Sequence, residues 1–181
     1  MVLLFGGFSA LAAAAAAAVV VIGSLGQATL GSVFGAAGAG GGAEAPVGAA
    51  GTSARVLEIV RAAGGDPGTG VSARAAGGGF AEVRPDAVVP AGATIRTDGR
   101  TRVRLALSDG SELTLNHGTE LSLDPEAPRR FHLVAGELLA DIAHLENAPN
   151  ASFITPTGSV EVVGTKFDLA ATDAFASVRV T

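Results

Sequence analysis

The chain has 181 residues, a formal net charge of −5, and no Cys, Trp or Tyr. The absence of Cys excludes a disulfide framework, a Cys-ligated zinc site, a thiolate nucleophile and an iron–sulfur cluster. The acidic balance lacks the basic footprint of a nucleic-acid-binding protein, so we expect no nucleic-acid partner. The first charged residue is Glu44, so an uncharged apolar segment precedes a domain of ordinary composition.

The first 25 residues are apolar enough to cross a membrane. The run Val2–Leu25 has 24 residues, and a helix of that length measures about 36 Å against a hydrocarbon core of about 30 Å. We therefore predict one N-terminal transmembrane helix at residues 1–25. No Lys or Arg precedes it to fix its orientation, and we expect that an upstream portion of the protein is missing. The alternative is a secretory signal peptide cleaved near Gly26-Gln27-Ala28.

Residues 26–53 are rich in Gly and Ala and contain only one charged side chain. This composition favours a flexible linker between the membrane segment and the following domain. The glycines between positions 38 and 42 do not follow a predicted strand, which excludes a dinucleotide-binding loop.

From residue 54 onward the hydrophobic period changes to two residues. In residues 102–108, Val and Leu alternate with Arg, Ala and Ser, which predicts a half-buried strand with arginines on its solvent face. Asp109-Gly110 follows and is a strong hairpin signal, because both residues tolerate a positive φ. We predict an all-β domain at residues 54–181, with short antiparallel strands in a sandwich or a solenoid-like roll.

Further strands and turns follow from the same alternation. We expect turns at residues 116–118 and 135–136 and a Gly-rich insertion at 64–79. Residues 137–146 carry Leu and Ile at helical spacing, yet we predict a strand followed by a loop there because strands flank the segment on both sides. The last strand still alternates at the final residue, so we expect that the sequence is cut short there as well. The other expected strands lie at residues 55–60, 80–83, 113–115, 121–123, 131–133, 160–162, 167–169 and 175–181, with one more beginning at Phe153.

Catalytic and metal-binding patterns are weak. His117, His132 and His144 are separated by 15 and 12 positions, which matches no metal-binding template, so we expect them at the surface. The segment Gly158–Lys166 departs from the spacing of a phosphate loop and lies between predicted strands instead of before a helix. We therefore predict no enzymatic activity, no cofactor and no metal site.

Three segments of the β domain stand in a characteristic order. They are IRTDGRTRVRLALSDGSELTLNHGTELSLD, FHLVAGELLADIAH and FITPTGSVEVVGTKFDL. With these segments, residues 95–170 resemble the FecR family, which are periplasmic sensors of bacterial cell-surface signalling systems. The resemblance implies a structural role, not a catalytic one, for the motif residues Asp109, Gly110, Ser111, Asn116, Gly136, Glu137, Asp141, Thr155, Pro156, Gly164, Thr165 and Phe167. It also implies a core that contains Leu105, Leu107, Leu113, Leu115, Phe131, Leu133, Phe167 and Leu169.

The resemblance implies a location, partners and a function. In that family a cytoplasmic segment binds an extracytoplasmic-function sigma factor, one helix crosses the inner membrane, and the β domain senses an outer-membrane TonB-dependent transporter. We accordingly expect a single-pass protein of the bacterial inner membrane with its C-terminal domain in the periplasm. Its expected partners are the membrane and the signalling domain of a transporter, with a sigma factor only if a cytoplasmic segment is missing here.

We expect the chain to act as a regulatory sensor in signalling of the iron-uptake type. Strand addition at an open sheet edge is the expected mode of contact, because main-chain donors are unpaired there. The alternative is an envelope-structural or ligand-binding module that shares the fold without regulating a sigma factor.

Overall fold

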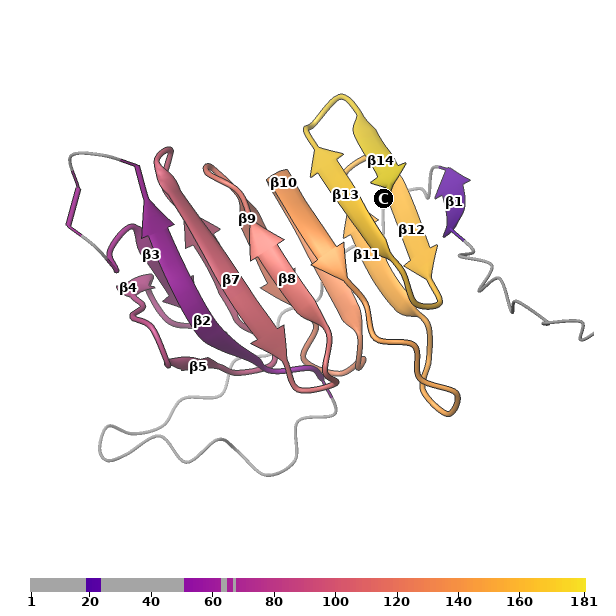
Figure 1. Cartoon of the computed structure of the whole chain (residues 1–181), viewed down its shortest axis with the longest axis horizontal. Coiled ribbons are helices and arrows are strands. Elements are labelled where there is room, and N and C mark those ends of the chain that lie inside the picture. The colour runs from indigo at the N-terminus through magenta and orange to yellow at the C-terminus, as the bar shows by residue number, and fades with distance from the viewer. Residues whose placement is uncertain (1–18, 24–50, 63–64, 67) are drawn as a thin grey trace, which may run out of the picture.

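The computed structural model describes residues 19–23, 51–62, 65–66 and 68–181, and all regular elements in them are strands (Figure 1). The predicted all-β class is therefore confirmed for the described domain. The strands are β1 (Val19–Gly23), β2 (Ala54–Arg61), β3 (Val71–Arg74), β4 (Ala81–Glu82), β5 (Val88–Val89), β6 (Thr94–Thr97), β7 (Thr101–Leu107), β8 (Glu112–Leu115), β9 (Glu120–Leu123), β10 (Arg130–Asp141), β11 (Ala151–Thr155), β12 (Gly158–Val162), β13 (Lys166–Ala171) and β14 (Ala176–Val180).

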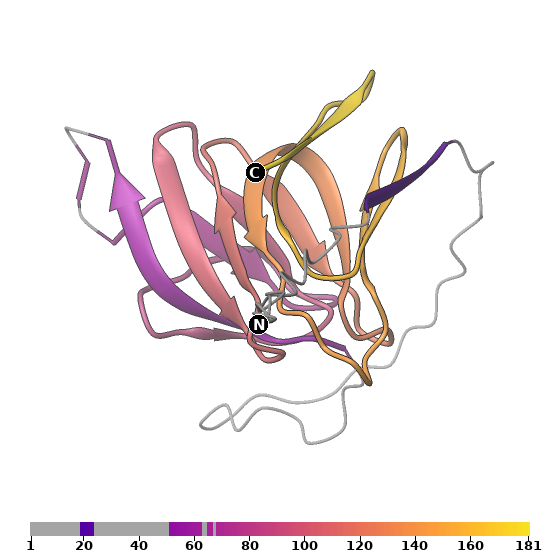
Figure 2. The same cartoon turned by 45° about the vertical axis from the view of Figure 1, so that its right-hand side comes forward.

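All the strands are hydrogen-bonded into one curled sheet that forms a half-barrel (Figures 1 and 2). The curled sheet has two layers, sheet A and sheet B, and β10 belongs to both. Sheet A has the order β4-β3-β6-β9-β10-β11-β12-β1, and sheet B has the order β5-β2-β7-β8-β10-β13-β14. Every pair is antiparallel except β10 and β11. The predicted antiparallel strands are thus confirmed, in a curled sheet.

Strand β10 passes from one sheet to the other at Gly136. Residues 130–135 pair with β9 and β11 in sheet A, whereas residues 136–141 pair with β8 and β13 in sheet B. The register shifts between Leu133 and Ala135, and Gly136 has a φ of 98°. The predicted turn at 135–136 is therefore wrong, because the chain bends there without reversing. A bulge with a Gly at positive φ bends a strand and increases its twist.

The core lies between the two layers, as the two-residue period requires. All eight residues expected in the core are buried, which confirms that prediction. Three phenylalanines form its centre: the rings of Phe131 and Phe153 are 4.9 Å apart, and Phe153 meets Phe167 edge to face at 5.3 Å. These aromatic contacts join β10 and β11 of sheet A to β13 of sheet B.

Several local predictions can be compared with the structure. The segment at 137–146 is a strand followed by a loop, as predicted. The Gly-rich insertion at 64–79 contains a strand, β3, that the sequence reasoning missed. Its apolar residue Val71 is buried, and the strand pairs with β6 and β4.

The predicted transmembrane helix at 1–25 lies mostly outside the described residues. Its described part, Val19–Gly23, forms β1 and pairs with Gly158–Val162 of β12, so the structure differs from the prediction at these five residues. Within the described ranges, no helix has both the length and the apolarity needed to span a membrane. Of the predicted linker, residues 26–50 fall outside the described ranges.

Candidate functional site

The Asp109-Gly110-Ser111 motif forms the turn between β7 and β8. Asp109 Oδ1 accepts a hydrogen bond from the Ser111 N–H at 2.9 Å, and its Oδ2 accepts one from the Ser111 hydroxyl at 3.1 Å. Gly110 has a φ of 85°, and no atom lies within 4 Å of the position of an added Cβ. The glycine is therefore required by backbone conformation alone.

A buried arginine contacts this turn from the loop before β10. The Arg129 side chain is 2% exposed and its Nε lies 3.0 Å from Asp109 Oδ2. The N–H is not aimed at that oxygen, so the contact is an ion pair without a hydrogen bond. Arg129 Nη2 donates to the carbonyl of Ala143 at 2.6 Å, and the Arg129 N–H donates to the Thr52 hydroxyl at 2.7 Å.

These contacts connect four segments that are distant from one another in the chain. We call the residues that make them the Arg129 corner: Thr52, Asp109, Ser111, Arg129 and Ala143. The Ser111 hydroxyl also accepts the N–H of Ala143 at 3.1 Å. Buried charges that are paired and hydrogen-bonded fix a unique arrangement, whereas a lone buried charge is costly. The corner thus holds the β7–β8 turn against both ends of β10.

A second set of motif residues meets at the other end of β8. Asn116 Nδ2 donates to Glu137 Oε2 at 2.8 Å, and the Asn116 N–H donates to the Glu137 carbonyl at 2.8 Å. The Thr119 hydroxyl donates to the same carbonyl at 2.9 Å and accepts the Glu137 N–H at 3.1 Å. The Thr97 hydroxyl donates to the Asn116 carbonyl at 2.6 Å and accepts the Thr119 N–H at 2.9 Å.

We call this set, Thr97, Asn116, Thr119, Gly136 and Glu137, the Thr119 corner. An added Cβ on Gly136 would lie 2.5 Å from Thr119 Cα, so only glycine allows the bend of β10 to pack here. The corner therefore fixes the place at which β10 changes sheets.

The remaining motif residues lie near the β11–β12 turn and at the start of β13. The Thr155 hydroxyl donates to the Gly158 carbonyl at 2.9 Å across the turn that contains Pro156. The carbonyl of Thr165 accepts the N–H of Ile142 at 3.0 Å. Like the contacts of the other two sets, these hydrogen bonds hold main-chain segments in place.

One polar contact and one close packing contact of the motif lie at the C-terminal end of β10 and in the loop that follows it. Asp141 is 3.1 Å from Lys166 in an exposed ion pair between β10 and β13. An added Cβ on Gly164 would lie 2.7 Å from the Cβ of His144, so the loop after β10 packs closely on this glycine. Phe167, the final motif residue, is buried in the core.

Two aspartates near these corners have lowered pKa values. The Thr101 hydroxyl lowers the pKa of Asp98 against a desolvation penalty, helped by the N–H of Arg100 and the charge of Arg61. Burial works against ionisation of Asp124. The N–H groups of Ala127 and Glu126 outweigh this effect and lower the Asp124 pKa.

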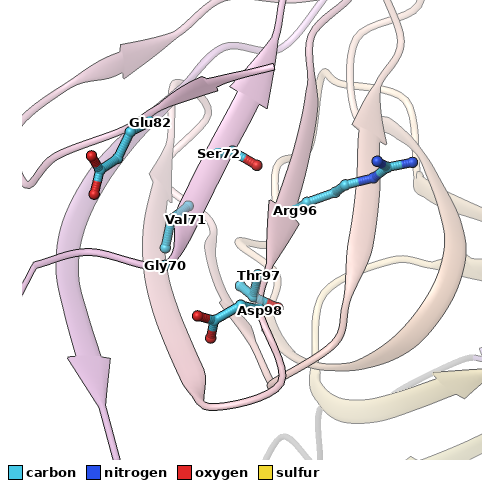
Figure 3. Close-up of a pocket in the computed structure, with 7 residues that line it drawn as sticks. All are labelled: Gly70, Val71, Ser72, Glu82, Arg96, Thr97 and Asp98. Carbon is cyan, nitrogen blue, oxygen red and sulfur yellow. The ribbon is translucent and has the colours of Figure 1, made fainter. Parts of the chain in front are cut away.

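A cavity of about 410 Å³ opens beside β3 and β6 (Figure 3). Its polar side chains do not converge: Figure 3 shows Glu82 and Arg96 pointing away from each other. Arg96 is bound to Glu120 at 2.7 Å and stacks on Phe80, with its guanidinium carbon 4.2 Å from the ring centre. Glu82 and Arg96 therefore do not form a converging pair in this cavity.

The histidines lie where the sequence predicted. His117 is in an exposed turn, His132 is on the outer face of β10, and His144 is in an exposed loop. His132 Nε2 is 3.5 Å from Asp124 Oδ2. In the described ranges, no three His, Asp or Glu side chains are grouped as metal ligands.

Sequence reasoning missed Arg129, Thr97 and Thr119, the residues that connect the motif segments. Arg129 stands next to Arg130, and nothing in the local pattern says which of the two is buried. Its positive φ of 58° is a structural finding. Thr119 follows the predicted turn at 116–118, but the partners of Thr97 and Thr119 are set by the packing of β6 against β9.

Comparison with known proteins identifies one family. The family model described as "FecR protein" matches residues 93–181, which include both corners except Thr52. No curated protein and no solved structure matches the chain. The chain therefore carries a FecR domain at residues 93–181.

Proposed function

We propose that this chain is a membrane-anchored periplasmic regulator that passes the state of an outer-membrane TonB-dependent transporter to a sigma factor, in signalling of the iron-uptake type. The observation that carries the proposal is the FecR match over residues 93–181. The sigma-factor step requires a cytoplasmic segment ahead of the anchor.

The hydrogen bonds of the motif residues support a function that depends on binding another protein and not on catalysis. Asp109, Ser111, Asn116 and Glu137 direct their polar atoms to partners inside the domain. A catalytic residue instead keeps a polar atom available to a substrate. The motif thus maintains a rigid β body, and a rigid body can present a surface to another protein.

The apolar run Val2–Leu25 supports the membrane anchor. It is long enough for a membrane-spanning helix and carries no charge. In an anchored chain, residues 19–23 would leave the edge of β12, because one segment cannot be both a membrane helix and β1. The anchored state would then expose the β12 edge to a partner strand.

A binding experiment tests the transporter contact. The full chain in detergent micelles is immobilised and mixed with the periplasmic signalling domain of the transporter encoded beside it. The proposal predicts retention of that domain and no retention of the equivalent domain from an unrelated transporter. Equal retention of both domains, or of neither, would contradict it.

A further inference from the structure

The outer edge of β14 carries an inference about the oligomeric state that goes beyond the proposed function. We propose that β14 pairs with β14 of a second copy of this chain, antiparallel and with Val178 on the two-fold axis. Sheet B of one copy would then continue into sheet B of the other. A closed two-fold interface of this kind uses the same surface on both subunits.

The hydrogen bonds of β14 show which groups are free. The N–H of Thr181 donates to the Lys166 carbonyl, and the N–H of Thr172 donates to the Phe175 carbonyl. In an antiparallel ladder, hydrogen-bonded pairs alternate with non-hydrogen-bonded pairs. The odd-numbered residues of β14 therefore direct their N–H and C=O groups toward β13. Ala176, Val178 and Val180 therefore direct their N–H and C=O groups away from the sheet. No described strand other than β13 pairs with β14.

This edge lacks the features that protect other sheet edges. At the opposite ends of the two layers, β4 and β5 have only two residues each, and Pro85 and Pro90 follow them in the chain. The β12 edge is covered by β1 as long as residues 19–23 are not part of a membrane helix. By contrast, β14 has five residues, no Pro and no register shift against β13. Short strands, prolines and bulges are the usual protection against edge pairing.

The sequence of β14 is suited to pairing with itself. With Val178 opposite its own copy, Ala176 pairs with Val180, and all five residues are matched. About six main-chain hydrogen bonds result, because each pair of outward-facing residues exchanges two. Arg179 then lies opposite Ser177 of the second copy. A shift by one pairing step in one direction would place Arg179 opposite itself, and like charges directly opposite are destabilising. A shift in either direction would match only three of the five residues of β14.

The side chains also favour a second copy on this edge. Val178 and Val180 stand on the inner face, beside Leu169 and Phe167 of β13. Val178 packs against the core, whereas Val180 is 49% exposed. Pairing would extend this apolar face with the same residues of the second copy and cover Val180. The β13–β14 hairpin projects beyond the other strands of the sheet (Figure 2).

Arg179 lies next to a side chain of opposite charge within its own subunit. Asp168 lies opposite it on β13 in the register of the two strands. A second copy brings the neutral Ser177 to the other side of Arg179, so the pairing places no like charge beside it. A transporter or other partner would have to use a different edge or displace the second copy.

Two matched variants test the dimer. V180K places a charge on the inner face at the edge, and V60K makes the same change at a side chain that is 52% exposed on β2, away from that edge. By sedimentation of the full chain in detergent, V180K should weaken dimerisation about tenfold or more, while V60K should dimerise like the parent chain. A parent chain that stays monomeric, or equal effects of the two variants, would overturn the proposal.

Disulfide formation tests the register independently, since the chain has no native Cys. S177C and R179C chains are prepared separately, mixed and oxidised. The proposal predicts a disulfide between the two different chains, with little product from either chain alone or from R179C mixed with V88C. Self-linking of S177C or R179C to a similar extent would overturn the proposed pairing. The experiment needs no partner protein, so its failure leaves the transporter contact to be judged separately.

Discussion

Arg129 Nε lies 3.0 Å from Asp109 Oδ2, and this ion pair joins the β7–β8 turn to the loop that leads into β10. The Arg129 side chain is 2% exposed and that of Asp109 is 13% exposed, so solvent screens the pair weakly. The Asp-Gly-Ser motif of the FecR domain therefore has a physical role that its local sequence does not reveal. It supplies the counter-charge for a buried arginine.

Removing the charge of Asp109 should destabilise the domain strongly. D109N leaves the Arg129 guanidinium buried without a counter-ion, which costs about 3–5 kcal/mol of unfolding free energy. The matched control is D66N, at an exposed aspartate in a loop. Urea denaturation followed by circular dichroism measures both. The double variant D109N/R129M should recover part of the loss. Equal stability of D109N and D66N would contradict the role of the ion pair.

Substitution of Gly136 should cost more than substitution of Gly110. Both have positive φ, but only at Gly136 would a Cβ meet another residue, Thr119 Cα at 2.5 Å. G110A should lose about 1 kcal/mol from backbone strain, whereas G136A adds a clash and should lose roughly 2–5 kcal/mol. The comparison by thermal or urea unfolding isolates the effect of close packing. Similar losses of unfolding free energy in the two variants would show that the Thr119 corner accommodates the added Cβ, and would contradict the prediction.

The Thr119 hydroxyl should contribute to stability through the backbone of Glu137. T119V keeps the shape of the side chain but removes one donor and one acceptor from a buried site. We expect a loss of about 1–3 kcal/mol, since the Glu137 N–H loses its partner while the Glu137 carbonyl still accepts the Asn116 N–H. T114V is the control, because Thr114 lies half-exposed on the same strand region. Amide hydrogen exchange at Glu137 should accelerate in T119V and stay unchanged in T114V.

Acid should destabilise the domain in part through Asp124. Its pKa is lowered in the folded state by the N–H groups that overcome its desolvation. A carboxyl with a lowered folded-state pKa stabilises the protein above its unfolded pKa of about 3.9. This contribution is lost as the pH falls through the lower, folded value. D124N should flatten the acid limb of the stability profile relative to D173N, an exposed control; parallel profiles would contradict the assignment.

Much of the β domain could be predicted because its alternation is regular. Residues 101–107 alternate between buried and exposed along β7, and Asp109-Gly110 follows as a tight turn. A strand with one buried face has only one register that buries its apolar side chains. For the same reason, the core residues of β8, β10 and β13 were predictable.

The bend at Gly136 was not predictable from local sequence. A Gly at positive φ occurs in turns and in bulges, so the outcome depends on Thr119, which packs against Gly136 from the position before β9. Strand β3 was missed because its four residues lie among glycines and only Val71 is buried. The burial of Arg129 in place of Arg130 likewise depends on Asp109, which lies 20 positions away in the chain.

A transcription measurement tests most directly whether the chain regulates signalling. The gene is deleted and restored on a plasmid, and expression from promoters of the associated sigma factor is compared with and without the transporter's substrate. The account predicts that deletion changes the substrate response and that restoration recovers it. Unchanged sigma-dependent transcription, together with altered surface properties of the cell, would contradict the account and favour an envelope-structural role.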